Sequence, residues 1–142
     1  MHIEPLNPES AAAQLLIAKS DAYMTALYPS ESNHLESVQA LKLSTVFFLG
    51  GHIDGELDAC GAAKTLTDDG RYGEIKRVFV LDHHRGKGLS KAIMERLETH
   101  LRATGVTIAR LETGIKQPEA LGLYRKIGYV DEAHLAATAA TH

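Results

Sequence analysis

The sequence predicts a mixed α/β fold (of the α+β kind) in which helices flank one mostly antiparallel sheet. Between residues 46 and 81, short runs rich in β-branched and aromatic residues alternate with turn signals, as in an antiparallel meander. After residue 81 the pattern alternates between helix and strand, which indicates a parallel crossover connection. No internal repeat or flexible linker interrupts the chain, so we expect a single domain over residues 1–142.

The chain before residue 46 predicts one short strand and two helices. Residues 1–6 can form an edge strand. Residues 10–27 carry apolar side chains at helical spacing, and the segment Tyr28-Pro29-Ser30 ends that helix. A second, short helix is expected to follow, with its cap at Ser32 or Asn33.

Three strands are expected next. They cover residues 46–49, 57–62 and 74–81, with turn signals at residues 52–55 and 68–70. Strands joined by tight turns pair with their neighbours, so these three predict the meander.

The remaining pattern predicts a helix, a strand, a helix and the start of another strand. Residues 88–104 place their apolar side chains on one helical face, and Gly105 is a natural C-terminal stop. Residues 106–113 predict a strand, and residues 118–128 predict a helix with proline in its first turn. One more strand is expected to begin at Tyr129.

The composition excludes several classes of protein. With 44% hydrophobic and 23% charged residues, the chain fits a soluble globular domain, and its net charge of −3 argues against a nucleic-acid partner. The single cysteine, Cys60, excludes an intrachain disulfide and favours a cytoplasmic location. No apolar run approaches the ~20 residues of a membrane-spanning helix, and no signal-peptide pattern is present, so we expect no membrane partner.

Positive charge is concentrated in one segment. Between Arg71 and Arg96 there are seven basic and three acidic residues, against eight and fifteen in the rest of the chain. Within it, a predicted strand leads into a loop with glycines at 86 and 88, and a helix begins at once. The glycines let backbone amides approach a ligand closely, and the free amides of a helix N-terminus favour a phosphate. The alternative is an ordinary strand-to-helix turn with solvated cations.

Two other phosphate-binding loops do not fit. The spacing of Gly86-Lys87-Gly88 differs from that of a Walker A loop. A dinucleotide-binding fingerprint would need glycine at position 91, which is Lys91 here.

The loop resembles one from a known family. Arg85-Gly86-Lys87-Gly88-Leu89-Ser90 is similar to the acetyl-CoA loop Arg/Gln-x-x-Gly-x-Gly/Ala of the GNAT superfamily of N-acetyltransferases, with Ser90 at the usual Gly/Ala position. A second segment, from Gln117 to Tyr129, resembles the family's Asn-x-x-Ala-x-x-Leu-Tyr…Gly-Phe/Tyr pattern, with Gln117 in the place of Asn. The resemblance covers residues 46–130 and points to a small bacterial, single-domain member.

The resemblance implies acetyl-CoA as co-substrate. No metal is expected, because no cysteine or second histidine cluster has ligand spacing. The cofactor would lie in a notch where the strand at 74–81 splays from the parallel strand at 106–113. The backbone of the first strand would pair with the pantetheine arm, the loop amides would hold the pyrophosphate, and Lys91 or Arg85 would reach an outer phosphate. The residues expected to contact the cofactor are Val78, Phe79, Val80, Arg85, Gly86, Lys87, Gly88, Leu89, Ser90, Lys91 and Gln117.

The resemblance also implies direct attack of a primary amine, from a small molecule or an amino acid, on the thioester. Tyr124 matches the family's tyrosine and would protonate the departing thiolate; the alternative is a core residue. Glu74 is the candidate base, and Glu112 is the second candidate. Otherwise Glu74 is a solvated strand-end residue paired with Lys76 or Arg77.

Further residues are expected at the acceptor site. Glu31 and His34 lie between the first two predicted helices, where family members shape the acceptor pocket; helix capping is the alternative. Lys76 and Glu112 would also contact the acceptor. Lys76 and Arg77 could hold a substrate carboxylate, whereas the acidic remainder of the chain would suit a cationic acceptor.

Three reactive-looking residues have simpler interpretations. His83 and His84 are expected to be plain loop residues, because nothing near them in the sequence has metal-ligand spacing. Cys60 is expected to be a small buried hydrophobic residue, not a nucleophile that carries an acyl group.

Residues 131–142 depart from the family pattern. They are rich in alanine and show no alternating β pattern, so we expect a shortened C-terminal hairpin and a frayed or disordered tail. A missing final strand would expose a sheet edge, which favours a homodimer, and would open the acceptor pocket. The alternatives to a small-molecule acetyltransferase are therefore an acetyl-CoA-binding module without efficient turnover and a protein acetyltransferase.

Overall fold

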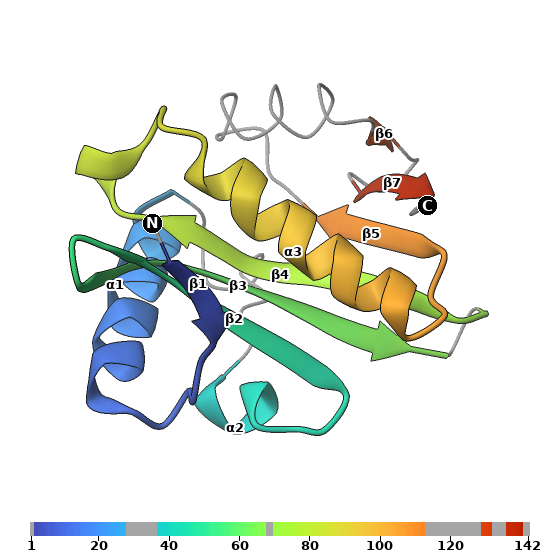
Figure 1. Ribbon diagram of the computed structural model, residues 1–142, viewed down its shortest axis with the longest axis horizontal. Helices are drawn as coiled ribbons and strands as arrows, with labels where there is room; N and C mark the ends of the chain where they lie inside the picture. Colours follow the sequence, from blue (N-terminus) through green and yellow to red (C-terminus); the bar gives the residue numbers. More distant parts are fainter. Residues whose placement is uncertain (1, 28–36, 68–69, 113–128, 132–135, 141–142) are drawn as a thin grey trace.

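The computed structural model describes residues 2–27, 37–67, 70–112, 129–131 and 136–140. Within these residues one sheet has the strand order β1-β2-β3-β4-β5-β7-β6 (Figure 1). Its strands are β1 (His2–Pro5), β2 (Val46–Ile53), β3 (Glu56–Leu66), β4 (Tyr72–Val80), β5 (Ile108–Glu112), β6 (Val130–Asp131) and β7 (Ala136–Ala140). The helices are α1 (Ala11–Leu27), α2 (Val38–Leu41), the short 3₁₀ helix η2 (Asp82–His84) and α3 (Leu89–Ala103).

The predicted meander and crossover are confirmed. β2, β3 and β4 pair antiparallel in sequence order, and β4 pairs parallel with β5 after the chain has passed through α3. The β2–β3 hairpin turns through Asp54 and Gly55, whose φ angles of 51° and 82° are those that a tight hairpin turn of this hand requires. The sequence pattern thus correctly predicts the mixed sheet.

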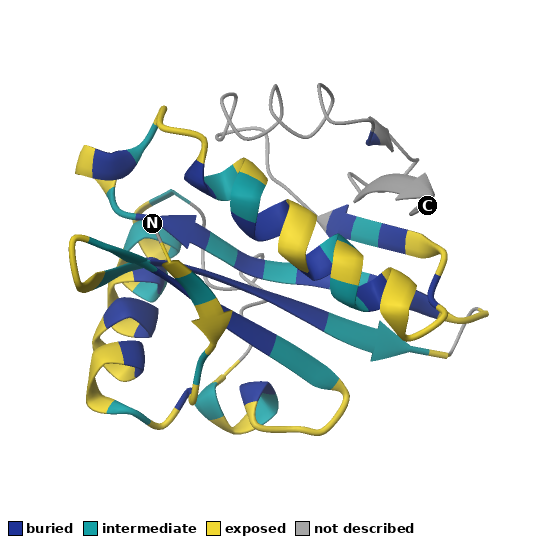
Figure 2. Cartoon of the chain, in the orientation of Figure 1, coloured by how far each residue is buried: buried dark blue, intermediate teal, exposed yellow. Residues whose placement is uncertain are grey.

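Helices cover both faces of the sheet. The apolar face of α3 (Leu89, Ile93, Met94, Leu97 and Leu101) is buried against the sheet, and Figure 2 shows this stripe along the helix. On that face α3 packs against a cluster that includes Leu49, Ile75 and Leu111. α1 and α2 pack with a second cluster, which includes Phe48, Cys60, Ala62 and Phe79. None of the described helices is long and apolar enough to span a membrane.

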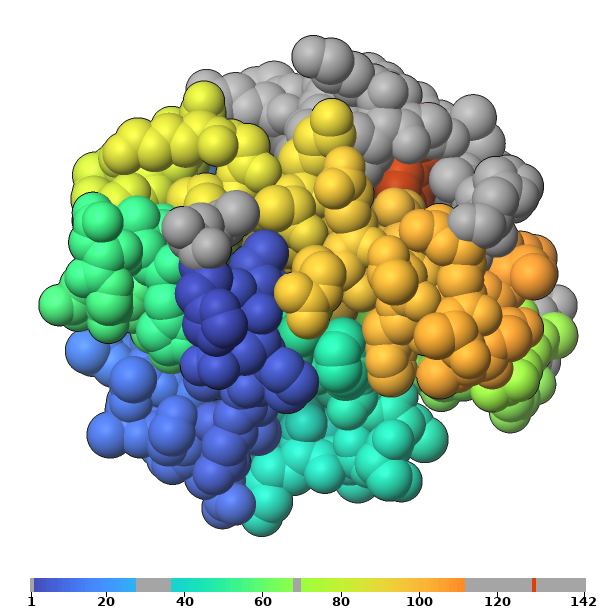
Figure 3. Space-filling view, in the orientation of Figure 1, coloured from blue at the N-terminus to red at the C-terminus, as the bar shows by residue number. Residues whose placement is uncertain are grey.

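The first strand and the second helix are present as predicted, although the second helix begins at another residue. β1 pairs antiparallel with β2 at the edge of the sheet, and Figure 3 shows it lying against α3, where Arg96 Nη1 donates to the Ile3 carbonyl at 3.2 Å. The helix that holds Val38 and Leu41 is capped by Ser37, whose Oγ accepts from the Ala40 amide at 3.1 Å. The cap expected at Ser32 or Asn33 was therefore placed too early for this helix.

The prediction of a frayed tail was wrong for Ala136–Ala140. These residues form β7, which pairs antiparallel with β5 from Ile108↔Ala140 to Glu112↔Ala136. The outer edge of β5 offers unsatisfied backbone donors and acceptors, and pairing with them outweighs the low strand propensity of alanine. The hairpin is nevertheless short, because β6 and β7 share only the pairs Val130↔Thr138 and Asp131↔Ala137.

β7 also removes the argument for a homodimer. That argument required the outer edge of β5 to be open, and β7 occupies it. The homodimer remains a prediction without support from this edge.

Candidate functional site

The parallel strands β4 and β5 separate near the middle of the sheet. Their parallel pairing covers Gly73↔Ala109, Glu74↔Arg110 and Ile75↔Leu111, and β4 then continues alone on this side to Val80 in the part of the chain that the structure describes (Figure 1). The predicted splayed parallel pair is therefore present. An extended ligand could pair with the backbone of β4 beyond Ile75 as an added strand does.

A β-bulge accompanies this separation. The β3–β4 register shifts so that Arg77 and Val78 together lie opposite Gly61, between the pairs Ala62↔Lys76 and Cys60↔Phe79. Arg77 has a φ of 58°, in the left-handed region that side-chain-bearing residues rarely adopt. A bulge bends the strand that carries it, which turns the end of β4 away from β5.

The Arg77 side chain anchors the bulge to α1. It is 3% exposed, and its Nη1 lies 2.6 Å from Asp21 Oδ1 and donates to Ser20 Oγ at 3.3 Å. Its carbonyl accepts a hydrogen bond from Cys60 Sγ at 3.2 Å. The expectation that Arg77 could hold a substrate carboxylate was therefore wrong, because the guanidinium is committed to the interior.

The glycine-rich loop presents uncapped backbone amides. Gly86 and Gly88 both have a φ of 80°, and open space surrounds the position that a Cβ would take on each. α3 begins directly after Gly88, which has no side chain to cap the first amides of the helix. Leu89 is buried and fixes the start of the helix. The geometry suits an anion at this N-terminus, as the loop pattern predicts.

The side chain of Arg85 folds back toward the sheet. Its Nε donates to the Val80 carbonyl at 3.1 Å, and its guanidinium lies 4.5 Å from the ring centre of Tyr23 on α1. Its Nη1 also pairs with Asp82 at 2.7 Å. In this structure the Arg85 side chain connects the loop to the end of β4 and to α1, and it does not extend toward an outer phosphate. Lys91, the other residue expected to reach an outer phosphate, has an exposed side chain, and its Nζ lies 4.0 Å from Glu95 Oε1.

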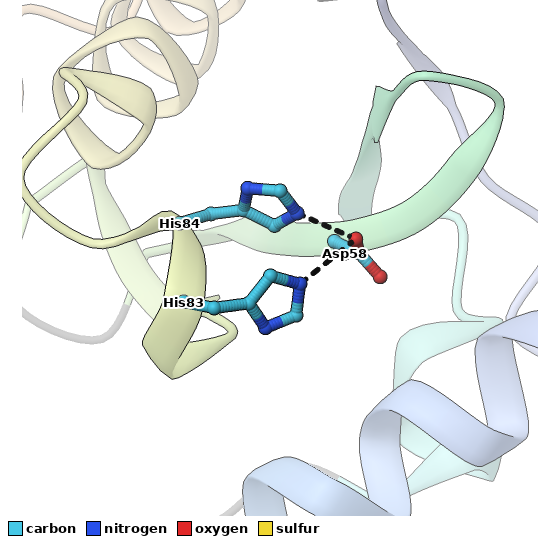
Figure 4. Close-up of side chains that lie close together, drawn as sticks. All are labelled: Asp58, His83 and His84. Carbon is cyan, nitrogen blue, oxygen red and sulfur yellow. Dashed lines mark hydrogen bonds and ion pairs between the residues drawn. The ribbon is translucent and has the colours of Figure 1, made fainter.

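Asp58 on β3 contacts His83 and His84. The sequence pattern does not predict this contact. His84 Nε2 lies 2.8 Å from Asp58 Oδ2, and His83 Nε2 lies 3.9 Å from the same oxygen (Figure 4). The nitrogen on the other side of the His84 ring lies 3.5 Å from Lys87 Nζ in the loop. The ligand atoms of the three residues lie within 4.8 Å of one another, so the set could in principle hold a divalent transition metal. The short His84–Asp58 contact is also explained as a hydrogen bond that ties the loop to β3.

Glu74 lies one residue before the end of the parallel pairing of β4 and β5. Its Oε1 is 2.9 Å from Lys76 Nζ, and both side chains are half-buried. Lys64 of β3 and Arg110 of β5 are its register partners on either side. The predicted pairing with Lys76 is confirmed, and the pairing with Arg77 is not formed.

Cys60 is not available as a nucleophile. It is fully buried, and burial raises the pKa of its thiol to about 12, with the nearby Arg77 opposing this rise in part. The thiol thus stays protonated near neutral pH, as the interpretation of a small buried hydrophobic residue requires.

Four predicted site residues lie outside the described residues: Glu31, His34, Gln117 and Tyr124. Glu112 is the last residue of β5, but its side chain is likewise outside the description. Conversely, sequence reasoning missed Asp58 and Tyr23, because each contacts the loop only through the fold. These contacts join segments that are distant in sequence, so no local signal could have identified the two residues.

The family model of the acetyltransferase (GNAT) family matches residues 14–129. The chain belongs to this family. An "IAA acetyltransferase" from Azospirillum brasilense is 40% identical to it over 125 residues, which are 88% of this chain and 81% of that protein.

Solved structures agree with the GNAT assignment. A Klebsiella pneumoniae protein assigned to the acyl-CoA N-acyltransferases matches with a TM-score of 0.79 and 30% identity, over 99% of this chain and 97% of that one. An aminoglycoside 6'-N-acetyltransferase in complex with coenzyme A shares the fold at 13% identity, with a TM-score of 0.75 over 100% of this chain and 98% of that one.

Proposed function

We propose that the protein transfers the acetyl group of acetyl-CoA to the primary amine of a small molecule or an amino acid. The observation that carries this proposal is a pair of features at one end of the sheet. β4 separates from β5, and the uncapped N-terminus of α3 follows the end of β4. The two features together suit a ligand with an extended arm and a pyrophosphate. A solved acetyltransferase with the same fold is a complex with coenzyme A, which is in keeping with this assignment.

The cofactor would be held mainly by backbone groups. The amides of residues 86–90 bind the pyrophosphate, with Lys87 and Lys91 adding positive charge. Val78, Phe79 and Val80 pair with the pantetheine arm, and Arg85 keeps the end of β4 and the loop in a fixed relation. The thioester then lies at the closed end of the notch, next to Glu74.

The reaction proceeds by direct attack. The acceptor nitrogen bonds to the thioester carbonyl carbon, the C–S bond breaks, and the electron pair leaves on sulfur. An alkylamine with a pKa near ~10 is mostly protonated at neutral pH, so Glu74 accepts its proton directly or through water. Tyr124 donates a proton to the departing thiolate, and a backbone N–H stabilises the oxyanion.

The alternative of a binding module without turnover has lost its main support. It rested on an unfinished sheet, and β7 and β6 complete the sheet beside β5. A small-molecule acceptor is the simpler proposal, and the name of the Azospirillum brasilense relative is in keeping with it.

Thiol release from acetyl-CoA with a panel of amines tests the proposed function. Glu74→Gln and Tyr124→Phe should each slow the single-turnover rate by ~10²-fold or more, the usual effect of removing a positioned acid or base. Acetyl-CoA affinity should change much less. Wild-type protein that binds acetyl-CoA but releases no thiol with any amine would refute transfer to small amines, and a Phe variant as fast as wild type would exclude Tyr124 as the acid.

A further inference from the structure

Two histidines and one aspartate from separate elements meet beside the start of the glycine-rich loop. His83 and His84 lie on η2, and Asp58 lies on β3, 26 residues before His84 in the sequence. Figure 4 shows both rings turned toward the carboxylate. The proposed acetyl transfer does not involve these three side chains, which we refer to as the His–Asp cluster.

Backbone hydrogen bonds hold the two sides of the His–Asp cluster in a fixed relation. The Leu81 amide donates to the Asp58 carbonyl at 3.0 Å, and the adjacent residues Ala59 and Val80 are register partners on β3 and β4. η2 follows at once, and the His84 amide donates to the Leu81 carbonyl at 2.9 Å. The three side chains therefore extend from a hydrogen-bonded frame, which a precise binding site requires.

A hydrogen bond accounts for only part of this arrangement. His84 Nε2 lies 2.8 Å from Asp58 Oδ2, a normal hydrogen-bond distance, but His83 Nε2 lies 3.9 Å from the same oxygen, which is too far for one. The two rings also lie close together, with centres 4.1 Å apart, although the His83 side chain is 68% exposed. If both rings were protonated to pair with Asp58, their like charges would repel each other. One shared cation between the three groups satisfies both rings.

The spacing of the three ligand atoms suits a metal ion. Zn²⁺ binds imidazole nitrogen and carboxylate oxygen at about 2.0–2.2 Å, so neighbouring ligand atoms of a tetrahedral site are about 3.3–3.6 Å apart. The two distances to Asp58 Oδ2, 2.8 Å and 3.9 Å, lie on either side of this range, and all three ligand atoms are within 4.8 Å of one another. Small side-chain rotations, above all of the exposed His83, would place them around one ion.

The ligand types and their surroundings also suit a divalent ion. Imidazole nitrogen and carboxylate oxygen both bind divalent transition metals, and the carboxylate neutralises part of the charge of the ion. The side chains of His84 and Asp58 are only 11% and 14% exposed, so solvent screens this attraction weakly. Lys87 Nζ lies 3.5 Å from His84 Nδ1 and opposes the ion. Lys87 is exposed, however, so its side chain can turn away once Nδ1 carries the ring proton.

We propose that Asp58, His83 and His84 bind a divalent transition-metal ion of the Zn²⁺ type, with water as the fourth ligand. The sequence-based expectation of no metal considered spacing along the chain, whereas Asp58 joins the two histidines only through the fold. The ion would connect η2 to β3 two residues before Gly86 and so hold the start of the glycine-rich loop in place. This proposal does not depend on the proposed function.

Zinc titration of the tag-free protein tests the proposal. The protein is treated with a chelator, exchanged into chelator-free buffer at neutral pH, and titrated with Zn²⁺ in a calorimeter. We expect one ion per chain with a Kd of about 1 µM or below, weaker than a structural site with four protein ligands. At 100 times its Kd, Zn²⁺ should raise the Tm by about 5–10 °C. Co²⁺ should bind in the same place with the visible spectrum of a four-coordinate ion.

Single substitutions distinguish the His–Asp cluster from the other histidines of the chain. His83→Gln and Asp58→Asn should each weaken Zn²⁺ binding by ~100-fold or more, because losing a direct ligand costs more than losing a residue that only orients one. The His83 side chain is largely exposed, so His83→Gln should leave the Tm of the metal-free protein unchanged. His2→Gln is the matched control. His2 is 70% exposed and lies 3.1 Å from Glu4, and this variant should bind Zn²⁺ as the wild type does.

Two results would overturn the metal site. Wild-type protein without a saturable Zn²⁺ site would leave the His–Asp cluster with the hydrogen bond between His84 and Asp58 alone. A Zn²⁺ affinity that survives His83→Gln would assign the bound ion to other histidines, and this variant decides the question even where Asp58→Asn destabilises the fold.

Discussion

Gly88→Glu is the most direct test of the anion site at the start of α3. Gly88 adopts a φ of 80° as the N-cap of this helix, and no atom lies within 4 Å of the position of a new Cβ. The substitution therefore creates no clash. It costs about 1–2 kcal/mol of backbone strain and places a negative charge beside the first free amides.

The loss of cofactor affinity follows from that charge. Two unit charges about 5 Å apart interact by about 3 kcal/mol at an effective dielectric constant of about 20, and by less where solvent screens them. A discounted value of about 1.5–3 kcal/mol corresponds to an affinity lower by ~10- to 100-fold. Gly88→Ala shares the strain without the charge, so it should lose much less affinity.

A thermal-shift titration with acetyl-CoA measures the effect. At 100 times its Kd a ligand adds about 2.7 kcal/mol to the free energy of unfolding, or about 5–10 °C in Tm for a domain of this size. The Glu variant at the same concentration should lose most of this gain. Gly70→Glu is the matched control: Gly70 has a φ of 72° with open space around it, and lies at the opposite end of β4. A full shift in the Gly88→Glu protein would refute the loop assignment.

Two further substitutions test the packing and the pH dependence. Gly73→Ala would drive its Cβ into the buried Leu101 side chain, so urea denaturation should show a loss of about 1–3 kcal/mol; unchanged stability would mean that α3 can move away from β4 at little cost. His100 stacks on Phe47, and burial lowers the pKa of its imidazole below the ordinary value of 6.5. The neutral imidazole therefore contributes its full stability to the fold above pH ~6.5, and this contribution is lost as the pH falls below ~6.5. His100→Gln should accordingly lose less stability than wild type between pH 7.5 and 5.5, and equal losses would contradict this assignment.

The elements of the fold were largely predictable because local patterns determine them. The apolar face of α3 and the turn at Gly55 both act through neighbouring residues, so periodicity and turn chemistry identify them. β7 was missed because its stability comes from pairing with β5, a contact between segments that are distant in sequence. Alanine supplies no local signal for such a strand.

Only those parts of the candidate site that are contiguous in the sequence were predictable. The loop from Arg85 to Ser90 is a contiguous motif, and Glu74 and Lys76 share one strand. The partners Lys64 and Arg110 depend on the register of three strands, and that register includes a bulge that nothing in the local sequence marks. Arg77 shows the same limit, because the adjacent cations Lys76 and Arg77 give no local sign of which side chain turns inward.

One turn of α1 supports both ends of the notch. Ser20 and Asp21 hold Arg77 at the bulge, where β4 leaves β5. Tyr23 lies under the guanidinium of Arg85, which in turn binds the last carbonyl of β4. The ion pair between the buried Arg77 and the half-exposed Asp21 and the cation–π contact both need α1 at a fixed distance from the sheet, which its buried residues in the second core cluster provide. The position of α1 therefore determines the separation of β4 from β5 and the place of the loop together, although α1 itself lies outside the glycine-rich motif.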